Sequence, residues 1–218
     1  KDRLEKGDWD VIIDDSWEKW SYVSSAFRDP NLPIIGVLHS SPMVYQSLPK
    51  VQWPCFVGIS EQHCTDIRLH LRCDARRVYN GLDLACYTLD AGIKRSDRYL
   101  FLGRYTPEKG PLRAIDLARK LRVPLDCVGD TNLVGDAGYV ERCRYACDGL
   151  MVRFMTEVPR SETVKLYRNH KALLSPIDWS EPFSLVHAEA AASGLPVLTF
   201  RKGAAPEVVK HGVSGFVL

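Results

Sequence analysis

The chain has 218 residues, of which 45% are hydrophobic and 26% are charged, and its formal net charge is +2. This length suits one large domain or two small ones, and the composition is that of an ordinary soluble globular protein. The near-neutral charge does not call for a nucleic-acid partner, and no apolar run approaches the roughly 20 residues needed to span a bilayer. We therefore expect a soluble protein that binds no nucleic acid.

The cysteines are odd in number and form no Cys-x-x-Cys pair, which favours free, mostly buried thiols in a reducing cytoplasm over disulfides or a zinc site. The first ten residues lack the apolar segment of a signal peptide. The expected location is therefore cytoplasmic, with peripheral contact with the inner face of a membrane left open. The seven cysteines are Cys55, Cys64, Cys73, Cys86, Cys127, Cys143 and Cys147.

Short β-rich runs alternate with helix-like stretches along the chain, and many runs are continuously apolar, as in strands buried on both faces. This alternation predicts βαβ units and parallel sheets covered by helices, and hence an α/β fold. The expected strands are 11–14, 33–39, 55–60, 76–80, 99–105, 125–129, 152–155, 172–175 and 196–200. The expected helices are 61–72, 110–121, 161–169 and 182–193.

A polar stretch without periodicity, residues 91–98, precedes the strand expected at 99–105. We interpret it as a linker between two domains. The predicted domains are residues 1–94 and residues 95–218.

The first candidate site is the strand, loop and helix start in residues 101–110. Gly103 permits close backbone approach, and Arg104 and Lys109 can both face the mouth of the loop, where a helix N-terminus already favours an anion. The alternative is a solvated loop that carries two surface cations.

The second candidate site is a loop that leads into the helix expected at 182–193. Glu181 stands at or before its cap, and the free amides of residues 183–185 could hold a phosphate. Glu189 follows eight residues later, on the order of 12 Å along a helix at 1.5 Å per residue. That separation suits two ends of one long ligand. The alternative is an acid that complements the helix dipole, followed by an exposed glutamate.

Two further segments carry weaker signals. His39 ends the strand expected at 33–39, and strand ends are where open α/β sheets bind ligands, although a structural hydrogen-bonding role is the alternative. Residues 201–216 indicate a glycine-rich strand-to-helix turn and a helix that stops near Gly212.

Taken together and in this order, these segments resemble the family-4 (group 1) glycosyltransferases, which have the GT-B fold. The resemblance is densest in FLGRYTPEKG, SPIDWSEPFSLVHAEAAASGLPV, GAAPEVV and HGVSGF, and it extends to IIGVLHSSP, FVGIS and VYNGLD in the first part. It implies two Rossmann-like lobes, of which the N-terminal one is incomplete here. It also implies retaining transfer from a nucleotide-sugar donor, such as a UDP- or GDP-sugar, to an unknown acceptor. The family needs neither an obligatory metal nor a cofactor.

The resemblance assigns a role to each candidate residue. Arg104 and Lys109 would neutralise the donor diphosphate, with Gly103 beside them, and this charge stabilisation is often the largest catalytic contribution. Glu181 would contact the transferred sugar, and His39 would lie near that sugar. The residues implied as catalytic are thus His39, Arg104, Lys109 and Glu181.

The remaining implied contacts bind the donor nucleotide. Glu189 would accept hydrogen bonds from the ribose hydroxyls. The amides of Phe183, Ser184 and Leu185 would meet the phosphates, and Thr156 and Val158 would line the base pocket.

Three departures from the family pattern stand out. Ser184 and Thr156 replace residues that are usually glycine, and both ends of the chain are short. An incomplete first lobe would expose apolar strand edges, which leaves homo-oligomer formation open.

Three other functions remain open at this stage. Another GT-B enzyme, such as a nucleotide-sugar epimerase, would share the phosphate and ribose contacts. A truncated nucleotide-sugar-binding module would bind without turnover. A metal-dependent GT-A enzyme is suggested by Asp8 and Asp10, although these acids suit the loop before the first strand better.

Overall fold

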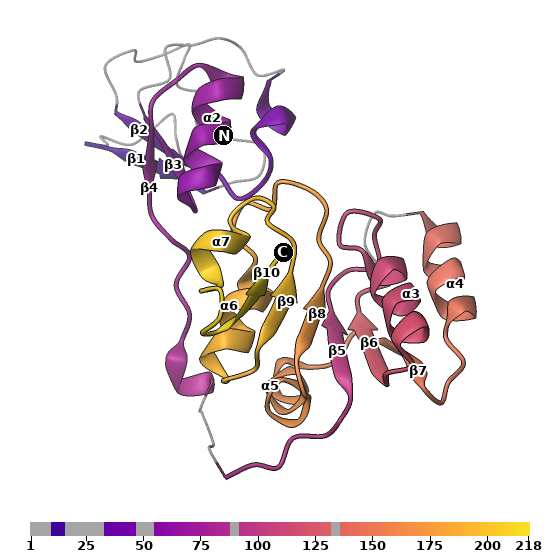
Figure 1. The fold of residues 1–218 in the computed structure, drawn as a ribbon. Helices are drawn as coiled ribbons and strands as arrows, with labels where there is room; N and C mark the ends of the chain where they lie inside the picture. Colours follow the sequence, from indigo (N-terminus) through magenta and orange to yellow (C-terminus); the bar gives the residue numbers. More distant parts are fainter. Residues whose placement is uncertain (1–9, 16–32, 47–54, 88–91, 132–135) are drawn as a thin grey trace. The chain divides into compact units, whose positions relative to one another are not determined.

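The structure, a computed structural model, describes residues 10–15, 33–46, 55–87, 92–131 and 136–218 (Figure 1). These residues form two compact units. The first comprises the described residues up to Asn80 together with Ser180–Phe183, and the second comprises the described parts of Gly81–Trp179 and Ser184–Leu218. Each unit contains one parallel sheet, so the predicted α/β class with two parallel-sheet lobes is confirmed.

The two units divide between Asn80 and Gly81, whereas the sequence placed the boundary between residues 94 and 95. Side chains from the intervening segment pack on the second unit. The Tyr87 hydroxyl donates to Glu189 at 2.8 Å, and the Arg95 guanidinium donates to the carbonyl of Tyr167 at 2.7 Å. These contacts place residues 81–87 and 92–98 with the second unit.

The first unit is built on a four-stranded parallel sheet in the order β1-β2-β3-β4. Helix α2 packs on this sheet, and the Ser60 hydroxyl caps it by accepting from the His63 amide at 2.9 Å. Phe56 and Ile67 are fully buried in the core between them. The elements are β1 (Ile12–Asp14), β2 (Ile34–Val37), the 3-10 helix η1 (Pro42–Tyr45), β3 (Cys55–Gly58), α2 (Glu61–Leu71) and β4 (Ala75–Arg77).

The second unit is built on a six-stranded parallel sheet in the order β10-β9-β8-β5-β6-β7. The chain runs outward from β5 through β6 to β7, and then returns to the other side of β5 with β8. The order therefore reverses next to β5. The strands are β5 (Tyr99–Leu102), β6 (Leu125–Gly129), β7 (Val152–Thr156), β8 (Leu173–Ser175), β9 (Val197–Thr199) and β10 (Gly215–Val217).

Helices cover both faces of this second sheet (Figure 1). The helical elements are η2 (Leu84–Cys86), α3 (Pro111–Leu121), α4 (Ala137–Ala146), α5 (Arg160–Asn169), α6 (Leu185–Ala192) and α7 (Ala205–Val208). Among the described residues, no helix is long and apolar enough to cross a membrane.

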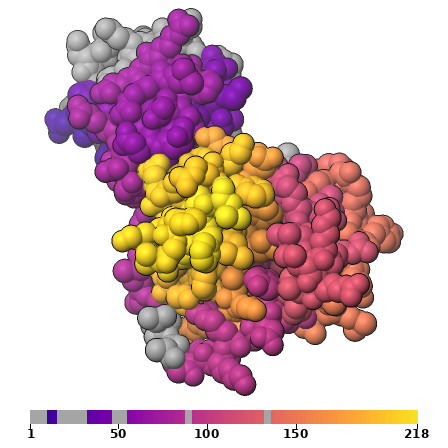
Figure 2. All heavy atoms as spheres, in the orientation of Figure 1, coloured from indigo at the N-terminus to yellow at the C-terminus, as the bar shows by residue number. Residues whose placement is uncertain are grey.

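The continuously apolar strands explain the two cores. Successive side chains of a strand point to opposite faces, so Leu100 joins the core under α5 and α6 while Phe101 joins the core under α3 and α4. Cys127 and Val128 divide between the cores in the same way. In the space-filling view, α3 and α4 form one part of this unit's surface, and the segment from α6 to β10 forms another (Figure 2).

All nine expected strands are present, and the helices differ from the prediction in several places. The helix expected at 182–193 begins only at Leu185, because Ser184 has a left-handed backbone with φ 66° and breaks the helical path. The helix expected to stop near Gly212 ends at Val208. Helix α4 was not predicted, since Gly138 and several charged residues obscure its periodicity.

Candidate functional site

A cavity of about 310 Å³ opens at the carboxyl ends of β5, β6 and β7. It lies beside the point where the strand order reverses, which is where open α/β sheets bind ligands. Its walls combine apolar strand ends with two carboxylates and one guanidinium. The lining residues are Leu102, Gly103, Arg104, Val128, Gly129, Asp130, Glu157, Val158 and Thr163.

The cavity depends on glycine at the ends of two adjacent strands. A Cβ atom on Gly129 would collide with the carbonyl oxygen of Gly103, so the two strand ends approach more closely than side chains allow. Beneath them, the buried Tyr105 hydroxyl lies 2.7 Å from the carbonyl oxygen of Cys127 and 2.9 Å from that of Met155. This contact ties β6 to β7 under the cavity.

The loop from Gly103 to Gly110 joins β5 to α3 and carries both predicted cations. Arg104 is exposed on the cavity wall, with its Nη2 atom 3.6 Å from Glu108 Oε1. Lys109 does not line the cavity; its Nζ atom lies 5.5 Å from the centroid of the Trp179 ring. The structure therefore puts the two cations in different surroundings within one loop.

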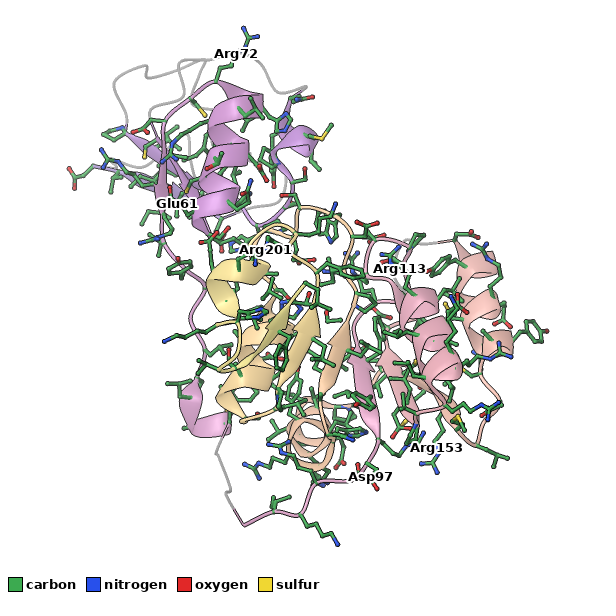
Figure 3. All side chains as sticks on the ribbon, in the orientation of Figure 1. Glu61, Arg72, Asp97, Arg113, Arg153 and Arg201 are labelled. Carbon is green, nitrogen blue, oxygen red and sulfur yellow. The ribbon has the colours of Figure 1, made fainter. Side chains whose placement is uncertain are left out.

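The end of this loop is fixed by its own backbone geometry. Gly110 caps α3 in a left-handed conformation with φ 79°, and a Cβ there would collide with the carbonyl oxygen of Pro176. Arg113, labelled in Figure 3, donates to that same carbonyl at 3.0 Å and to the carbonyl of Pro107 at 3.1 Å. The loop is thus attached to the exit of β8. Pro111 at the first helical position suits the start of α3.

Helix α6 begins at the predicted phosphate-binding segment. Ser184 is its N-cap and makes no side-chain capping bond, and Leu185 is the first helical residue. The first amides of a helix have no partner within that helix, so the N-terminus of α6 favours an anion. Pro182, expected inside the first turn, instead precedes the helix.

His187 is a buried residue of α6 and was not among the predicted site residues. Its Nε2 atom lies 2.8 Å from the Oγ atom of Ser175, at the end of β8. Burial, with a smaller effect from the charge of Lys109, lowers the pKa of His187 to about 3. The imidazole is therefore neutral near pH 7. The sequence feature that could have indicated His187 is a polar residue within an otherwise apolar helix face.

Glu189 is half-buried, and both of its carboxylate oxygens accept hydrogen bonds from tyrosines. The Tyr87 hydroxyl donates to Oε1 at 2.8 Å, and the Tyr167 hydroxyl donates to Oε2 at 2.8 Å. Arg160 donates in turn to the Tyr87 hydroxyl at 2.8 Å. These three partners were not predicted from the sequence, because they lie 22 to 102 residues away from Glu189 or Tyr87 and leave no local pattern.

The predicted base-pocket residues divide at the end of β7. Val158 lines the cavity together with Glu157, whereas Thr156 is the exposed last residue of the strand and is not part of the lining. Thr163 of α5 completes this wall and was not predicted.

The candidates of the first unit have their own surroundings. The Nε2 atom of His39 lies 2.6 Å from Asp15 Oδ1, and both side chains are exposed. His63 of α2 holds the next residue after His39, since its Nε2 atom lies 2.9 Å from the carbonyl oxygen of Ser40. Glu181 and Phe183 are buried in the short segment Ser180–Phe183. Of the acids considered for a GT-A metal site, Asp8 lies outside the described residues.

Comparison with solved structures defines the fold class. The chain superimposes on Anabaena Alr3699/HepE, solved in complex with UDP-glucose, with a TM-score of 0.80 at 20% identity, covering 100% of this chain and 67% of that one. AviGT4, a glycosyltransferase involved in avilamycin A biosynthesis, gives a TM-score of 0.69 at 24% identity, covering 98% and 62%. The fold is the GT-B type that the sequence predicted.

Sequence comparison defines the family. The model of the family "Glycosyl transferases group 1" matches residues 91–218, which is more than half of the chain. The chain belongs to this family.

Curated relatives are consistent with this membership. D-inositol 3-phosphate glycosyltransferase of Corynebacterium efficiens is 31% identical over 193 residues, covering 73% of this chain and 43% of the relative. Spore coat protein SA of Bacillus subtilis is 27% identical over 171 residues, covering 67% and 45%. The chain thus spans less than half the length of these relatives.

Proposed function

We propose that this chain is the donor-binding part of a retaining family-4 glycosyltransferase, which moves a sugar from a nucleotide-sugar to an acceptor. The observation that carries the proposal is the cavity at the carboxyl end of β5, with Arg104 on its wall and glycines at its strand ends. Membership of the group 1 glycosyl transferases supports it, as does the UDP-glucose bound to the Anabaena neighbour.

Within this proposal, the second unit binds the nucleotide. Val158 lines the space for the base, with Thr156 at its edge, and Glu189 accepts from the ribose. Arg104 and Lys109 offset the charge of the diphosphate, which grows on the leaving group as the donor bond breaks. Gly103 leaves room for the phosphates to approach the backbone.

The amides of Phe183, Ser184 and Leu185 complete the proposed phosphate contacts. Glu181 and His39 are proposed as contacts of the transferred sugar, on the family resemblance alone. With cationic side chains and amides to stabilise the leaving diphosphate, we propose that transfer needs no metal ion.

Isothermal calorimetry of the chain against UDP-, GDP- and ADP-sugars, with and without EDTA, tests donor binding. We expect one nucleotide class to bind, and to bind equally well in EDTA. Binding to none of them contradicts the proposal. A strict requirement for manganese would instead favour metal-dependent chemistry.

Donor hydrolysis and transfer assays test catalysis in the same preparation. Turnover with retained anomeric configuration, read by NMR, supports the transferase. Tight binding without turnover under any condition supports a nucleotide-sugar-binding module instead.

The variant Glu181→Gln separates the proposed roles of the two glutamates. Its affinity for the bare nucleotide should stay within about twofold of the wild-type value. Its affinity for the sugar nucleotide should fall, because the lost contact is to the sugar. Glu189→Gln should weaken both ligands. Identical profiles for the two variants would rule out this division.

The expected cytoplasmic location, peripheral membrane contact and self-association stay predictions. Cell fractionation, co-sedimentation with anionic vesicles and analytical ultracentrifugation measure them directly.

A further inference from the structure

The carboxylate of Glu189 is held by two tyrosines that come from different parts of the second unit. Tyr167 is a fully buried residue of α5, and Tyr87 follows the 3-10 helix η2 and is 4% exposed. Each hydroxyl donates to a different carboxylate oxygen at 2.8 Å. The carboxylate is therefore fixed at both oxygens.

Two hydrogen bonds do not exhaust a carboxylate, which has about four lone-pair sites. Glu189 as a whole residue is half-buried rather than fully buried. Fixing the carboxylate before a ligand arrives removes the need to order this side chain on binding. The remaining lone pairs thus have a set direction.

Tyr87 links Glu189 to the exposed residue Arg160 through a chain of hydrogen bonds. It donates to Glu189 and accepts from Arg160, whose guanidinium carbon also lies 5.6 Å from the centroid of the Tyr87 ring. Burial raises the pKa of Tyr167, and burial together with the bond to Glu189 raises that of Tyr87. Both hydroxyls therefore remain protonated donors across the physiological range, and hydrogen bonds linked in this way strengthen one another.

We propose that Tyr167 and Tyr87 are positioning residues that set ribose selectivity, by aiming the free acceptor sites of Glu189 at the 2′- and 3′-hydroxyls of the donor nucleotide. This inference rests on the proposed function, because it takes Glu189 as the ribose contact.

A purely structural role for the tyrosines makes a different prediction. If their hydroxyls only hold α5 and the end of η2 to α6, then losing one weakens ligands with and without the ribose hydroxyls by the same factor. If they aim Glu189, the loss falls on ribose nucleotides and spares nucleotides that lack both ribose hydroxyls. The ratio of the two affinities therefore separates the roles.

The experiment measures this ratio by calorimetry. The ligand is whichever of UDP, GDP and ADP binds tightest, paired with its 2′,3′-dideoxy counterpart, which lacks both hydroxyls. The proteins are the wild type, Tyr167→Phe, Tyr87→Phe and the control Tyr139→Phe. Tyr139 is a buried tyrosine of α4 in the opposite core of the same unit. Thermal melting confirms that each variant is folded.

We expect the wild type to prefer the ribose nucleotide. Each of the Glu189-linked variants should lose about fivefold in affinity for it, the net effect of one hydrogen bond, with the dideoxy nucleotide changed by less than about twofold. Tyr139→Phe should keep the wild-type ratio. Should Tyr167→Phe fail to fold, Arg160→Gln replaces it, because this exposed residue donates to the Tyr87 hydroxyl, which in turn donates to Glu189.

Equal losses for the ribose and the dideoxyribose nucleotide, or no loss, overturn the positioning role while leaving donor binding intact. A wild type that binds nucleotides without ribose preference also overturns it alone. A wild type that binds no nucleotide overturns the proposed function, and this inference with it.

Discussion

The imidazole of His187 lies against Ser175 inside the second unit, with Nε2 2.8 Å from Oγ. Among the described residues, the Nδ1 atom of His187 has no hydrogen-bond partner. Protonation would place a charge on a buried imidazole, and burial disfavours the charged form, which agrees with the pKa of about 3 for His187.

This burial makes folding stability depend on pH. The unfolded chain takes up a proton on this residue below its ordinary pKa of 6.5, whereas the folded chain does so only near 3. His187 therefore has no effect on stability above about pH 7. As the pH falls from there toward 3, it progressively lowers the free energy of unfolding.

His187→Leu should remove that part of the pH dependence. Urea unfolding at pH 6.5 and pH 5 should show the wild type losing about 1–2 kcal/mol more than the variant. His63, whose pKa burial also lowers, is present in both proteins and cancels. Parallel pH profiles for the two proteins would contradict a neutral buried His187.

Asp126 should stabilise the start of β6 through an ion pair. Arg98 lies 2.6 Å from its Oδ1, and His170 lies 3.0 Å from its Oδ2. Burial raises the pKa of Asp126, but the hydrogen bonds from His170 and Arg98 outweigh this effect and hold that pKa at about 2. The stabilisation is therefore present above about pH 4 and is lost as the pH falls toward 2.

We expect Asp126→Asn to lower the free energy of unfolding by about 2 kcal/mol at pH 7, because the mostly buried cation loses its partner. Asp97→Asn, at the exposed residue labelled in Figure 3, should change it by less than about 0.5 kcal/mol. Equal effects from the two substitutions would show that the pair contributes nothing beyond surface charge.

Ser184 occupies a left-handed conformation, with φ 66° and ψ 84°, at the start of α6. Glycine adopts this region without the steric cost of a Cβ, whereas a β-branched residue is strained there. Chemical denaturation should therefore find Ser184→Gly neutral or stabilising within about 1 kcal/mol, and Ser184→Val clearly destabilising. Valine tolerated better than glycine would mean that the left-handed turn is wrong.

Lys109→Ala should lower the affinity for a nucleoside diphosphate about ten- to a hundredfold, because a charge-assisted hydrogen bond to phosphate is lost. The affinity for the free nucleoside should not change. Lys165→Ala removes an exposed cation of α5 and serves as the matched control. Calorimetry with both ligands measures the difference. A similar loss for nucleoside and diphosphate would place Lys109 away from the phosphates.

Local pattern was enough to locate most elements of the fold. Continuous apolar runs such as 125–129 and 99–105 indicated strands buried on both faces, because a central strand meets helices on each side. The Gly103–Gly110 loop and Glu189 were likewise singled out from spacing and residue type within short segments.

Other features follow from contacts between distant residues, and these only the tertiary structure decided. The start of α6 depends on the left-handed backbone of Ser184, a conformation that a serine side chain does not predict. Tyr87 meets Glu189 across 102 residues, and Arg160 meets Tyr87 across 73. No periodicity within one helix or strand encodes such a meeting. It arises when the sheet order brings separate elements together, so the chemistry around Glu189 became visible only in three dimensions.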